Sequence, residues 1–100
     1  MPRERQSPAP NPMQREERAE VGRWLKARRE EAGLTQKDLA EKVGSVYNTF
    51  VSQIELGVGR IPPERYLEWC VALDVEPKIF ALQMIKANEP EAYRMLFINP

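Results

Sequence analysis

The sequence predicts an all-α protein, a compact bundle of five to six helices preceded by a disordered N-terminal tail. Apolar residues recur at spacings of three and four from about residue 16 onward, which is the spacing of one face of a helix. Glycines and prolines divide this pattern into segments of helical length. The sequence has neither the alternating apolar pattern of a β-strand nor an Asn-Gly hairpin turn.

Length and composition favour one folded domain without a membrane-spanning segment. The chain has 100 residues, of which 42% are hydrophobic and 30% are charged, so it is too apolar to be disordered throughout. Its longest apolar runs are far shorter than a bilayer requires. The N-terminus has no apolar signal segment, and the single cysteine, Cys70, cannot form an internal disulfide. We therefore expect a soluble protein in the reducing cytoplasm, with no membrane partner.

The N-terminal segment MPRERQSPAPNP is expected to be disordered. It carries four prolines and no large apolar residue after Met1, so burial cannot offset the entropy lost on ordering. We place this tail at residues 1–15. Its Arg3 and Arg5 could touch a phosphate backbone, but Glu4 dilutes their charge, and we prefer a solvated tail.

The first helix is expected over about residues 16–32. Its apolar pattern recurs at three and four, and Gly33 supplies the left-handed conformation that commonly ends a helix. The residues that set the spacing are Val21, Trp24, Leu25 and Arg28.

Two shorter helices should follow. Thr35 opens the second helix with Asp38 three residues later, which predicts a capping box. Gly44 ends this helix, and the third begins at residue 45 or 46 and ends before Gly57. The residues expected to face inward are Leu39, Ala40, Val43, Val51 and Ile54.

Three further helices are expected in the C-terminal part. The loop GVGRIPP ends in tandem prolines that open a fourth helix at residues 64–73, Pro77 opens a fifth, and Pro90 opens a sixth. The fourth helix should turn Tyr66, Leu67, Cys70 and Leu73 inward, and the rings of Trp24, Tyr66 and Trp69 sit at core spacing. The last two helices carry further apolar residues at Ile79, Phe80, Leu82, Met84, Ile85, Tyr93, Leu96 and Phe97.

The residue inventory argues against an enzyme or a metalloprotein. The chain has no histidine, which removes the commonest general base and metal ligand. One cysteine cannot build a structural zinc site, and Cys70 lies at helical spacing as a buried thiol would. Gly57 and Gly59 form a Gly-x-Gly without the preceding strand or third glycine of a phosphate-binding loop. We expect no catalytic residue, no metal and no cofactor.

Charge is balanced overall but unevenly distributed. Fifteen basic residues match fifteen acidic ones, whereas a nucleic-acid-binding domain is usually basic. Residues 21–60 hold seven basic and five acidic side chains, and residues 61–100 hold four basic and six acidic ones. Any electropositive face should therefore belong to the middle of the chain.

The stretch LTQKDLAEKVGSVYNTFVSQIELG, residues 34–57, has the spacing of a helix-turn-helix. The exposed face of a helix usually carries Lys and Glu, but the second helix of this stretch carries short polar side chains there. Asn and Gln amides can donate to and accept from an adenine edge, and Thr methyls and aromatic rings can contact the thymine methyl in the major groove. The residues concerned are Tyr47, Asn48, Thr49, Ser52 and Gln53.

The sequence resembles the Cro/C1-type, or XRE-like, helix-turn-helix repressors of bacteria and phages over about residues 25–82. The resemblance rests on LKARREEAGLTQKDLAEKVG, on VSQIELG at the end of the third helix, and on ALDVEP between the fourth and fifth. It implies a lambda-repressor-like DNA-binding domain at residues 16–88. It also implies a cytoplasmic, nucleoid-associated transcriptional regulator that reads double-stranded DNA with the helix around residues 46–56.

The resemblance assigns roles to single residues. Glu55 would be structural and would pair with Arg28 or Arg29 of the first helix. The base-reading residues would be Asn48, Thr49 and Gln53, with Tyr47 at their rim. The DNA-backbone residues would be Gln36, Lys37, Ser52 and Arg60.

The sequence departs from the family pattern by one additional residue between Gly44 and Ile54. If the turn around Ser45 absorbs it, the assigned residues keep their roles. If it enters the helix, Tyr47 or Phe50 moves to the groove. We assign Phe50 to the core in preference to a thymine contact, since phenylalanine is usually buried.

The last two helices offer more apolar residues than a domain this small can bury, which predicts a partner surface. We expect a homodimer, because paired reading helices recognise a palindrome. Residues 89–100 would form the dimerisation extension, and the interface would hold Phe80, Met84, Tyr93, Leu96 and Phe97. In the alternative arrangement the sixth helix folds back to complete the monomer core. The alternative function is a protein-interaction module, such as an antitoxin or adaptor, built on the same fold.

Overall fold

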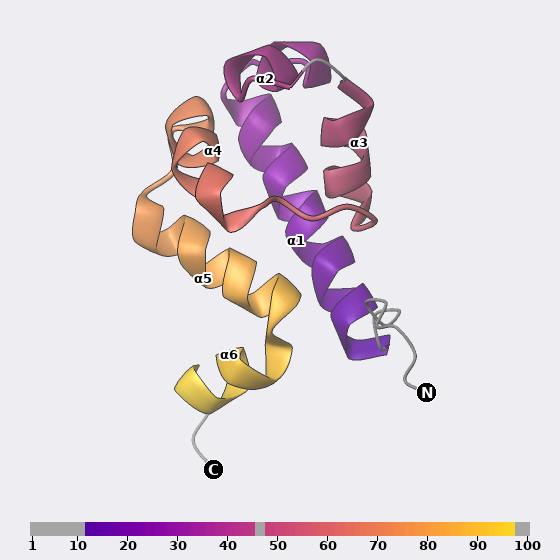
Figure 1. Cartoon of the computed structure of the whole chain (residues 1–100), viewed down its shortest axis with the longest axis vertical. Helices are drawn as coiled ribbons and strands as arrows, with labels where there is room; N and C mark the ends of the chain where they lie inside the picture. Colours follow the sequence, from indigo (N-terminus) through magenta and orange to yellow (C-terminus); the bar gives the residue numbers. More distant parts are fainter. Residues whose placement is uncertain (1–11, 46–47, 98–100) are drawn as a thin grey trace, which may run out of the picture.

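The computed structural model describes residues 12–45 and 48–97, and these form six α-helices and one 3₁₀ helix without any strand (Figure 1). The all-α prediction is confirmed. The helices are α1 (Pro12–Glu31), α2 (Gln36–Lys42), α3 (Asn48–Leu56), η1 (Pro63–Arg65), α4 (Tyr66–Leu73), α5 (Pro77–Asn88) and α6 (Pro90–Phe97). None of these helices has an apolar stretch long enough to cross a bilayer.

Helix α1 begins at Pro12, four residues before the predicted start. Proline suits the first turn of a helix because its fixed φ is helical and its missing N–H would be unpaired there. The early turns also have partners far along the chain: Gln14 Nε2 donates to the carbonyl oxygen of Asn88 at 3.4 Å, and Lys86 Nζ lies 3.3 Å from Glu20 Oε2. Most of the predicted tail, residues 1–11, lies outside the described residues.

The long helix α1 organises the bundle. Figure 1 shows α3 on one side of α1 and the α4–α5 pair on the other, with α2 across one end and α6 at the opposite end. Helix α1 packs directly against both α3 and α5. The helix-turn-helix therefore rests on the same helix that the C-terminal half packs against.

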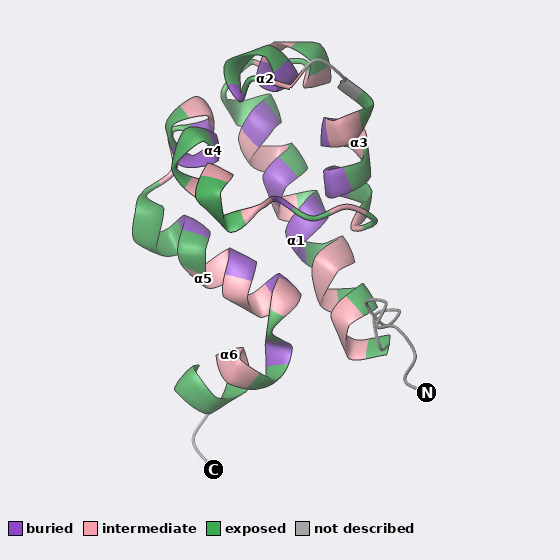
Figure 2. Cartoon of the chain, in the orientation of Figure 1, coloured by how far each residue is buried: buried purple, intermediate pink, exposed green. Residues whose placement is uncertain are grey.

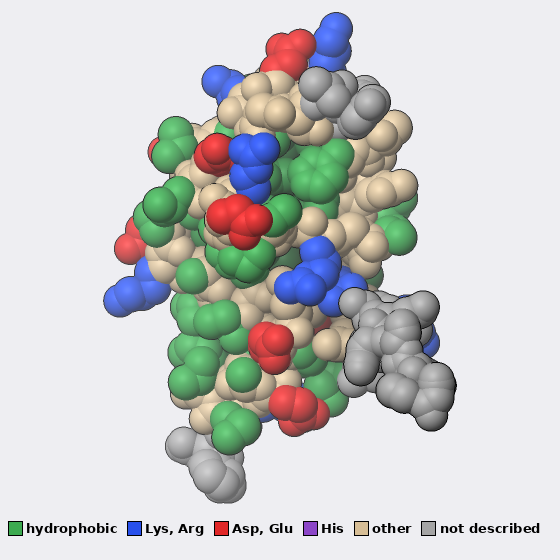
Figure 3. Space-filling model, viewed as in Figure 1, with side chains coloured by type: hydrophobic (Ala, Val, Ile, Leu, Met, Phe, Trp, Pro, Cys, Tyr) green, Lys and Arg blue, Asp and Glu red, His purple; other side chains and the backbone are tan. Residues whose placement is uncertain are grey.

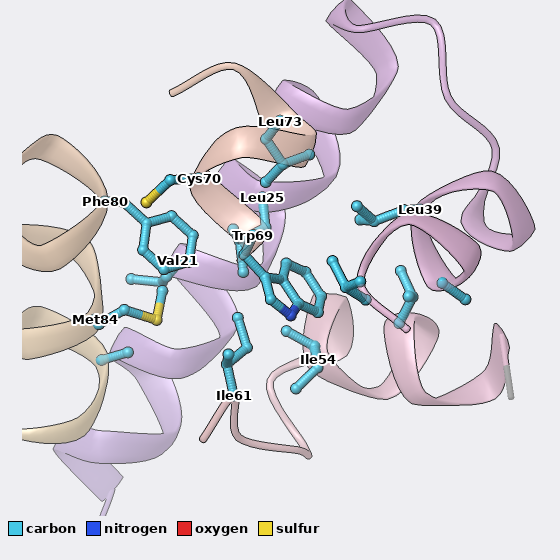
Figure 4. Packing of buried hydrophobic residues seen from close by; sticks show 14 residues of the cluster. Val21, Leu25, Leu39, Ile54, Ile61, Trp69, Cys70, Leu73, Phe80 and Met84 are labelled. Carbon is cyan, nitrogen blue, oxygen red and sulfur yellow. The ribbon is translucent and has the colours of Figure 1, made fainter. Parts of the chain in front are cut away.

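Aromatic side chains from four helices pack in or against the core, and Figure 4 shows Trp69 and Phe80 among the aliphatic side chains of the buried cluster. Trp69 is 1% exposed and meets the ring of Phe50 edge-on, with centroids 6.2 Å apart. Phe80 packs against Trp24 on one side and against Tyr66 on the other, at centroid distances of 6.4 and 5.7 Å. The predicted core assignment of these rings is confirmed, and Figure 2 shows the buried positions along the inner faces of the helices.

Two expectations about α4 and α5 are wrong. Leu67 is 67% exposed, because Trp69, Cys70 and Leu73 define the buried face of α4 and Leu67 lies on the opposite side. Phe80 is fully buried and Met84 nearly so, since α5 turns both toward α1 and α4. These two residues belong to the core of the protomer and leave no surface for a dimer partner.

Helix α6 does not complete the core. Pro90 is its buried residue, Tyr93 is half-buried, and Met95, Leu96 and Phe97 are exposed. The alternative in which the sixth helix folds back to bury Leu96 and Phe97 is therefore wrong.

Two glycines let α1 and α3 approach closely. A Cβ on Gly22 would lie 2.7 Å from the carbonyl carbon of Glu55, and a Cβ on Gly57 would lie 2.8 Å from the backbone nitrogen of Ala19. Gly57 also has a φ of +83°, which other residues adopt only at a cost. Backbone contact between α1 and the end of α3 thus requires glycine at both positions.

The burial pattern predicts the cost of truncating two leucines. Leu39→Ala should lower the free energy of unfolding by about 2–5 kcal/mol, because Leu39 is fully buried and its loss leaves a cavity. Leu67→Ala makes the same chemical change on the surface and should stay within about 0.5 kcal/mol. Urea unfolding followed by circular dichroism measures both. Equal losses would contradict the described packing of α4.

Candidate nucleic-acid interface

Helix α2 begins with the predicted capping box. The Asp38 backbone N–H donates to Thr35 Oγ1 at 3.0 Å, and the Thr35 N–H donates to Asp38 Oδ2 at 2.9 Å. These hydrogen bonds hold the pKa of Asp38 below its ordinary value. The box fixes where α2 starts, so that Lys37 lies exposed in its first turn.

A buried ion pair connects α1 to α3. Arg29 Nε donates to Glu55 Oε2 at 2.6 Å, and Arg29 Nη2 donates to Glu55 Oε1 at 3.1 Å. The two side chains are only 9% and 4% exposed, and the hydrogen bonds raise the pKa of Arg29. The predicted pairing of Glu55 is confirmed with Arg29, whereas Arg28 pairs with Glu31 on the surface at 2.8 Å.

Two more groups complete this buried site. Arg29 Nη1 donates to the carbonyl oxygen of Leu34 at 2.8 Å, and Gln36 Nε2 donates to Glu55 Oε1 at 3.0 Å. We call Arg29, Glu55 and Gln36 the brace. It joins α1, the loop after α1, α2 and α3, so the orientation of the two helices of the motif is set from inside.

The outer face of α3 carries Thr49, Gln53 and Leu56, all of them exposed. They lie four and three residues apart, which places them on one side of a helix. Phe50 is half-buried and packs on Trp69, so Phe50 does not belong to the outer face. The outer face is uncharged.

The other predicted contact residues occupy mixed positions. Ser52 is half-buried, and its Oγ donates to the Thr49 carbonyl oxygen at 3.0 Å. Arg60 is exposed in the loop after α3. Tyr47 lies outside the described residues, and of Asn48 only its place as the first residue of α3 is described.

Sequence reasoning missed two residues of this surface. Leu56 is 71% exposed and Val58 is 68% exposed, at the end of α3 and in the loop that follows. The spacing from Thr49 through Gln53 to Leu56 could have revealed the first of them. Exposed apolar side chains beside polar ones suit a surface that contacts thymine methyl groups.

The described residues include no group of three or more His, Cys, Asp or Glu side chains that could hold a metal ion. Cys70 is buried, and desolvation raises the pKa of its thiol. A raised pKa keeps the thiol protonated and unreactive.

Comparison with known proteins identifies the family. The family described as helix-turn-helix matches residues 25–80, so this chain belongs to that family, the Cro/C1-type helix-turn-helix class that its sequence resembles. The chain is also similar to an uncharacterised HTH-type transcriptional regulator of Sinorhizobium fredii, with 33% identity over 85 residues. That match covers 82% of this chain and 59% of the relative.

The brace predicts that replacing the buried Arg29 destabilises the protein more than replacing the surface residue Arg28. Arg29→Met should lower the free energy of unfolding by about 3–5 kcal/mol, because Glu55 would be left buried without its partner. Arg28→Met removes a surface ion pair and should cost at most about 1 kcal/mol. Chemical unfolding at pH 7 measures both variants.

A double variant separates the ion pair from its packing. Arg29→Met with Glu55→Leu should recover most of the stability lost by Arg29→Met alone, since apolar replacement of both partners leaves no buried charge. If Arg29→Met were as mild as Arg28→Met, Glu55 would not be held by the brace.

Proposed function

We propose that this chain is a sequence-specific regulator that lays the outer face of α3 in the major groove of double-stranded DNA, acting without a cofactor in the cytoplasm and on the nucleoid. One observation carries the proposal: the outer face of α3 holds uncharged polar and apolar side chains at groove-reading spacing, while the brace fixes its inner face. The family assignment over residues 25–80 agrees with it.

Each exposed residue of α3 has a matching chemistry on a base edge. The Gln53 amide can donate to and accept from an adenine in a bidentate pair, and Leu56 and the Thr49 methyl can meet a thymine methyl. Asn48 has the same amide chemistry as Gln53. Tyr47, to which the family resemblance gives a place at the rim, lies outside the described residues.

The flanking residues would hold the DNA backbone. Lys37 is exposed in α2 and Arg60 in the loop after α3, and both carry the charge that phosphate contacts need. Gln36 gives one amide hydrogen to Glu55, which leaves a second, oriented N–H for a phosphate oxygen. The Ser52 hydroxyl can accept or donate at the edge of the same surface.

Two alanine variants test base reading against backbone binding. Gln53→Ala should cost about 1–3 kcal/mol of discrimination at one base pair and leave non-specific binding unchanged. Lys37→Ala should instead weaken binding to all duplexes and lower the slope of log K against log[salt] by about 0.9. Fluorescence anisotropy against a selected operator and its single-base variants measures both.

The outcomes distinguish the proposed function from its alternative. A uniform loss across all sequences for Gln53→Ala would remove Gln53 from base reading. Absence of any salt-dependent duplex binding by the wild type would favour a protein-interaction module.

We further propose that the regulator acts as a homodimer through α6. Met95, Leu96 and Phe97 present exposed apolar side chains there, and the rings of Tyr93 and Phe97 lie 4.8 Å apart. An exposed apolar surface of this kind commonly marks a partner site, and a two-fold pair of reading helices reads a palindrome.

The combined change Leu96→Asp with Phe97→Asp should convert a dimer into a folded monomer, because both side chains are exposed and contribute little to the core of the protomer. Multi-angle light scattering gives the mass, and circular dichroism checks the fold. Wild-type protein that is monomeric at high micromolar concentration would contradict the dimer.

A further inference from the structure

Two arginines from distant parts of the chain meet beside the end of α3. Arg18 comes from α1 and Arg60 from the loop after α3, and both line a cavity of ≈ 20 Å³. Burial, and after it the repulsion from the charge of Arg60, lowers the pKa of Arg18. Figure 3 shows basic side chains gathered where this loop passes over α1.

Neither arginine has an acidic partner in the part of the chain that the structure describes. No ion pair within residues 12–45 and 48–97 includes Arg18 or Arg60. The Nε atom of Arg18 is buried and makes no hydrogen bond. A buried N–H without an acceptor is costly, and two cations without an anion between them repel. A bound anion at the surface would relieve the repulsion between the two guanidinium groups.

The loop that carries Arg60 is tied to the reading helix. The backbone N–H groups of Val58 and Gly59 donate to the Gln53 carbonyl oxygen at 2.9 and 3.2 Å. Gly57 holds the same loop against α1 next to Arg18, since a Cβ there would lie 3.0 Å from the Arg18 carbonyl carbon. The arginine pair is therefore placed relative to Gln53 by backbone contacts on both sides.

The size of the cavity limits what can bind. A volume of ≈ 20 Å³ has room for a water molecule and not for an organic ligand. Any larger anion must lie at the mouth of the cavity, where Arg60 is exposed. Paired guanidinium groups suit the oxygens of a phosphate, which accept several N–H donors at once.

We propose that Arg18 and Arg60 together bind one phosphate group of the DNA backbone next to the base pairs that Gln53 contacts. This inference rests on the proposed function. Arg18 precedes residues 25–80, the part that the family matches, so the N-terminal turns of α1 add a phosphate contact to the helix-turn-helix. Free inorganic phosphate offers the same chemistry and is the other source to be tested.

The salt dependence of duplex binding tests the shared site. The double variant Arg18→Gln with Arg60→Gln should lower the slope of log K against log[salt] by about 0.9, the value for one phosphate. The single-charge control Lys78→Gln, on the exposed start of α5, should leave the slope unchanged. A fall of about 1.8 would mean two separate phosphate contacts and would overturn the shared site, as would no fall.

Charge-preserving variants separate binding from folding. Arg18→Lys with Arg60→Lys should keep the wild-type slope, because each side chain still carries its charge. The double glutamine variant should melt no lower than wild type in the absence of DNA, since it removes two unpaired, repelling cations. If the double lysine variant also lowered the slope of log K against log[salt], the contribution of the two arginines would not be electrostatic, and the inference would be wrong.

A final comparison distinguishes DNA from free phosphate. Melting without DNA is measured in sodium phosphate and in sodium chloride at equal ionic strength, for wild type and for the double glutamine variant. We expect the two proteins to respond alike. A phosphate-specific stabilisation of wild type that the variant lacks, with an unchanged DNA slope, would make this a free-anion site. If Gln53→Ala impaired duplex binding but the double glutamine variant bound duplex as wild type does, this inference alone would fail. If wild type bound no duplex at all, the proposed function would be overturned too.

Discussion

The arrangement of the helix-turn-helix depends on one buried interaction, the ion pair between Arg29 and Glu55. Each residue of a helix is rotated by about 100° from the one before it, so residues 53 and 55 point to nearly opposite sides of α3. Because Glu55 points toward α1, Gln53 points toward solvent. Gly22 permits this contact, because a Cβ there would collide with the backbone of Glu55. Replacing a buried ion pair by apolar residues is often neutral for stability, whereas removing one partner is costly. Here the arrangement that the pair defines is the outward face of α3.

The chain has no net charge, but only some of its charged side chains form ion pairs. Five acidic side chains form ion pairs among the described residues: Glu55 with Arg29, Glu31 with Arg28, Glu68 with Arg65, and Glu17 and Glu20 with Lys86. Other acidic side chains, Glu30, Glu41 and Glu64 among them, are in none of these pairs. Lys37, Arg18 and Arg60 take part in none of these pairs. They lie around the motif formed by α2 and α3, where a phosphate backbone would need them. A net charge of zero is therefore compatible with an anion-binding face.

The sequence predicts the helices well, because apolar spacing and glycine stops are local signals. It also predicts the Glu55 pairing and the outward positions of Thr49 and Gln53. It fails where the answer depends on contacts far along the chain. The start of α1 depends on partners near residue 88, and in apolar-rich α4 and α5 only the neighbouring helices decide that Leu67 is exposed while Met84 is buried. Arg18 escaped notice for the same reason, since its neighbour Arg60 is remote in sequence.

The central claim is that α3 and its flanking basic residues contact duplex DNA. Backbone amide chemical shifts of ¹⁵N-labelled protein, followed during titration with an operator duplex selected from a random library, test this claim most directly. The account predicts that shift changes concentrate at residues 36–38 and 49–60 and at the α1 turn around Arg18, and that α4 to α6 change little. Changes centred on the exposed apolar residues of α4 or α6, with α3 unaffected, would contradict it.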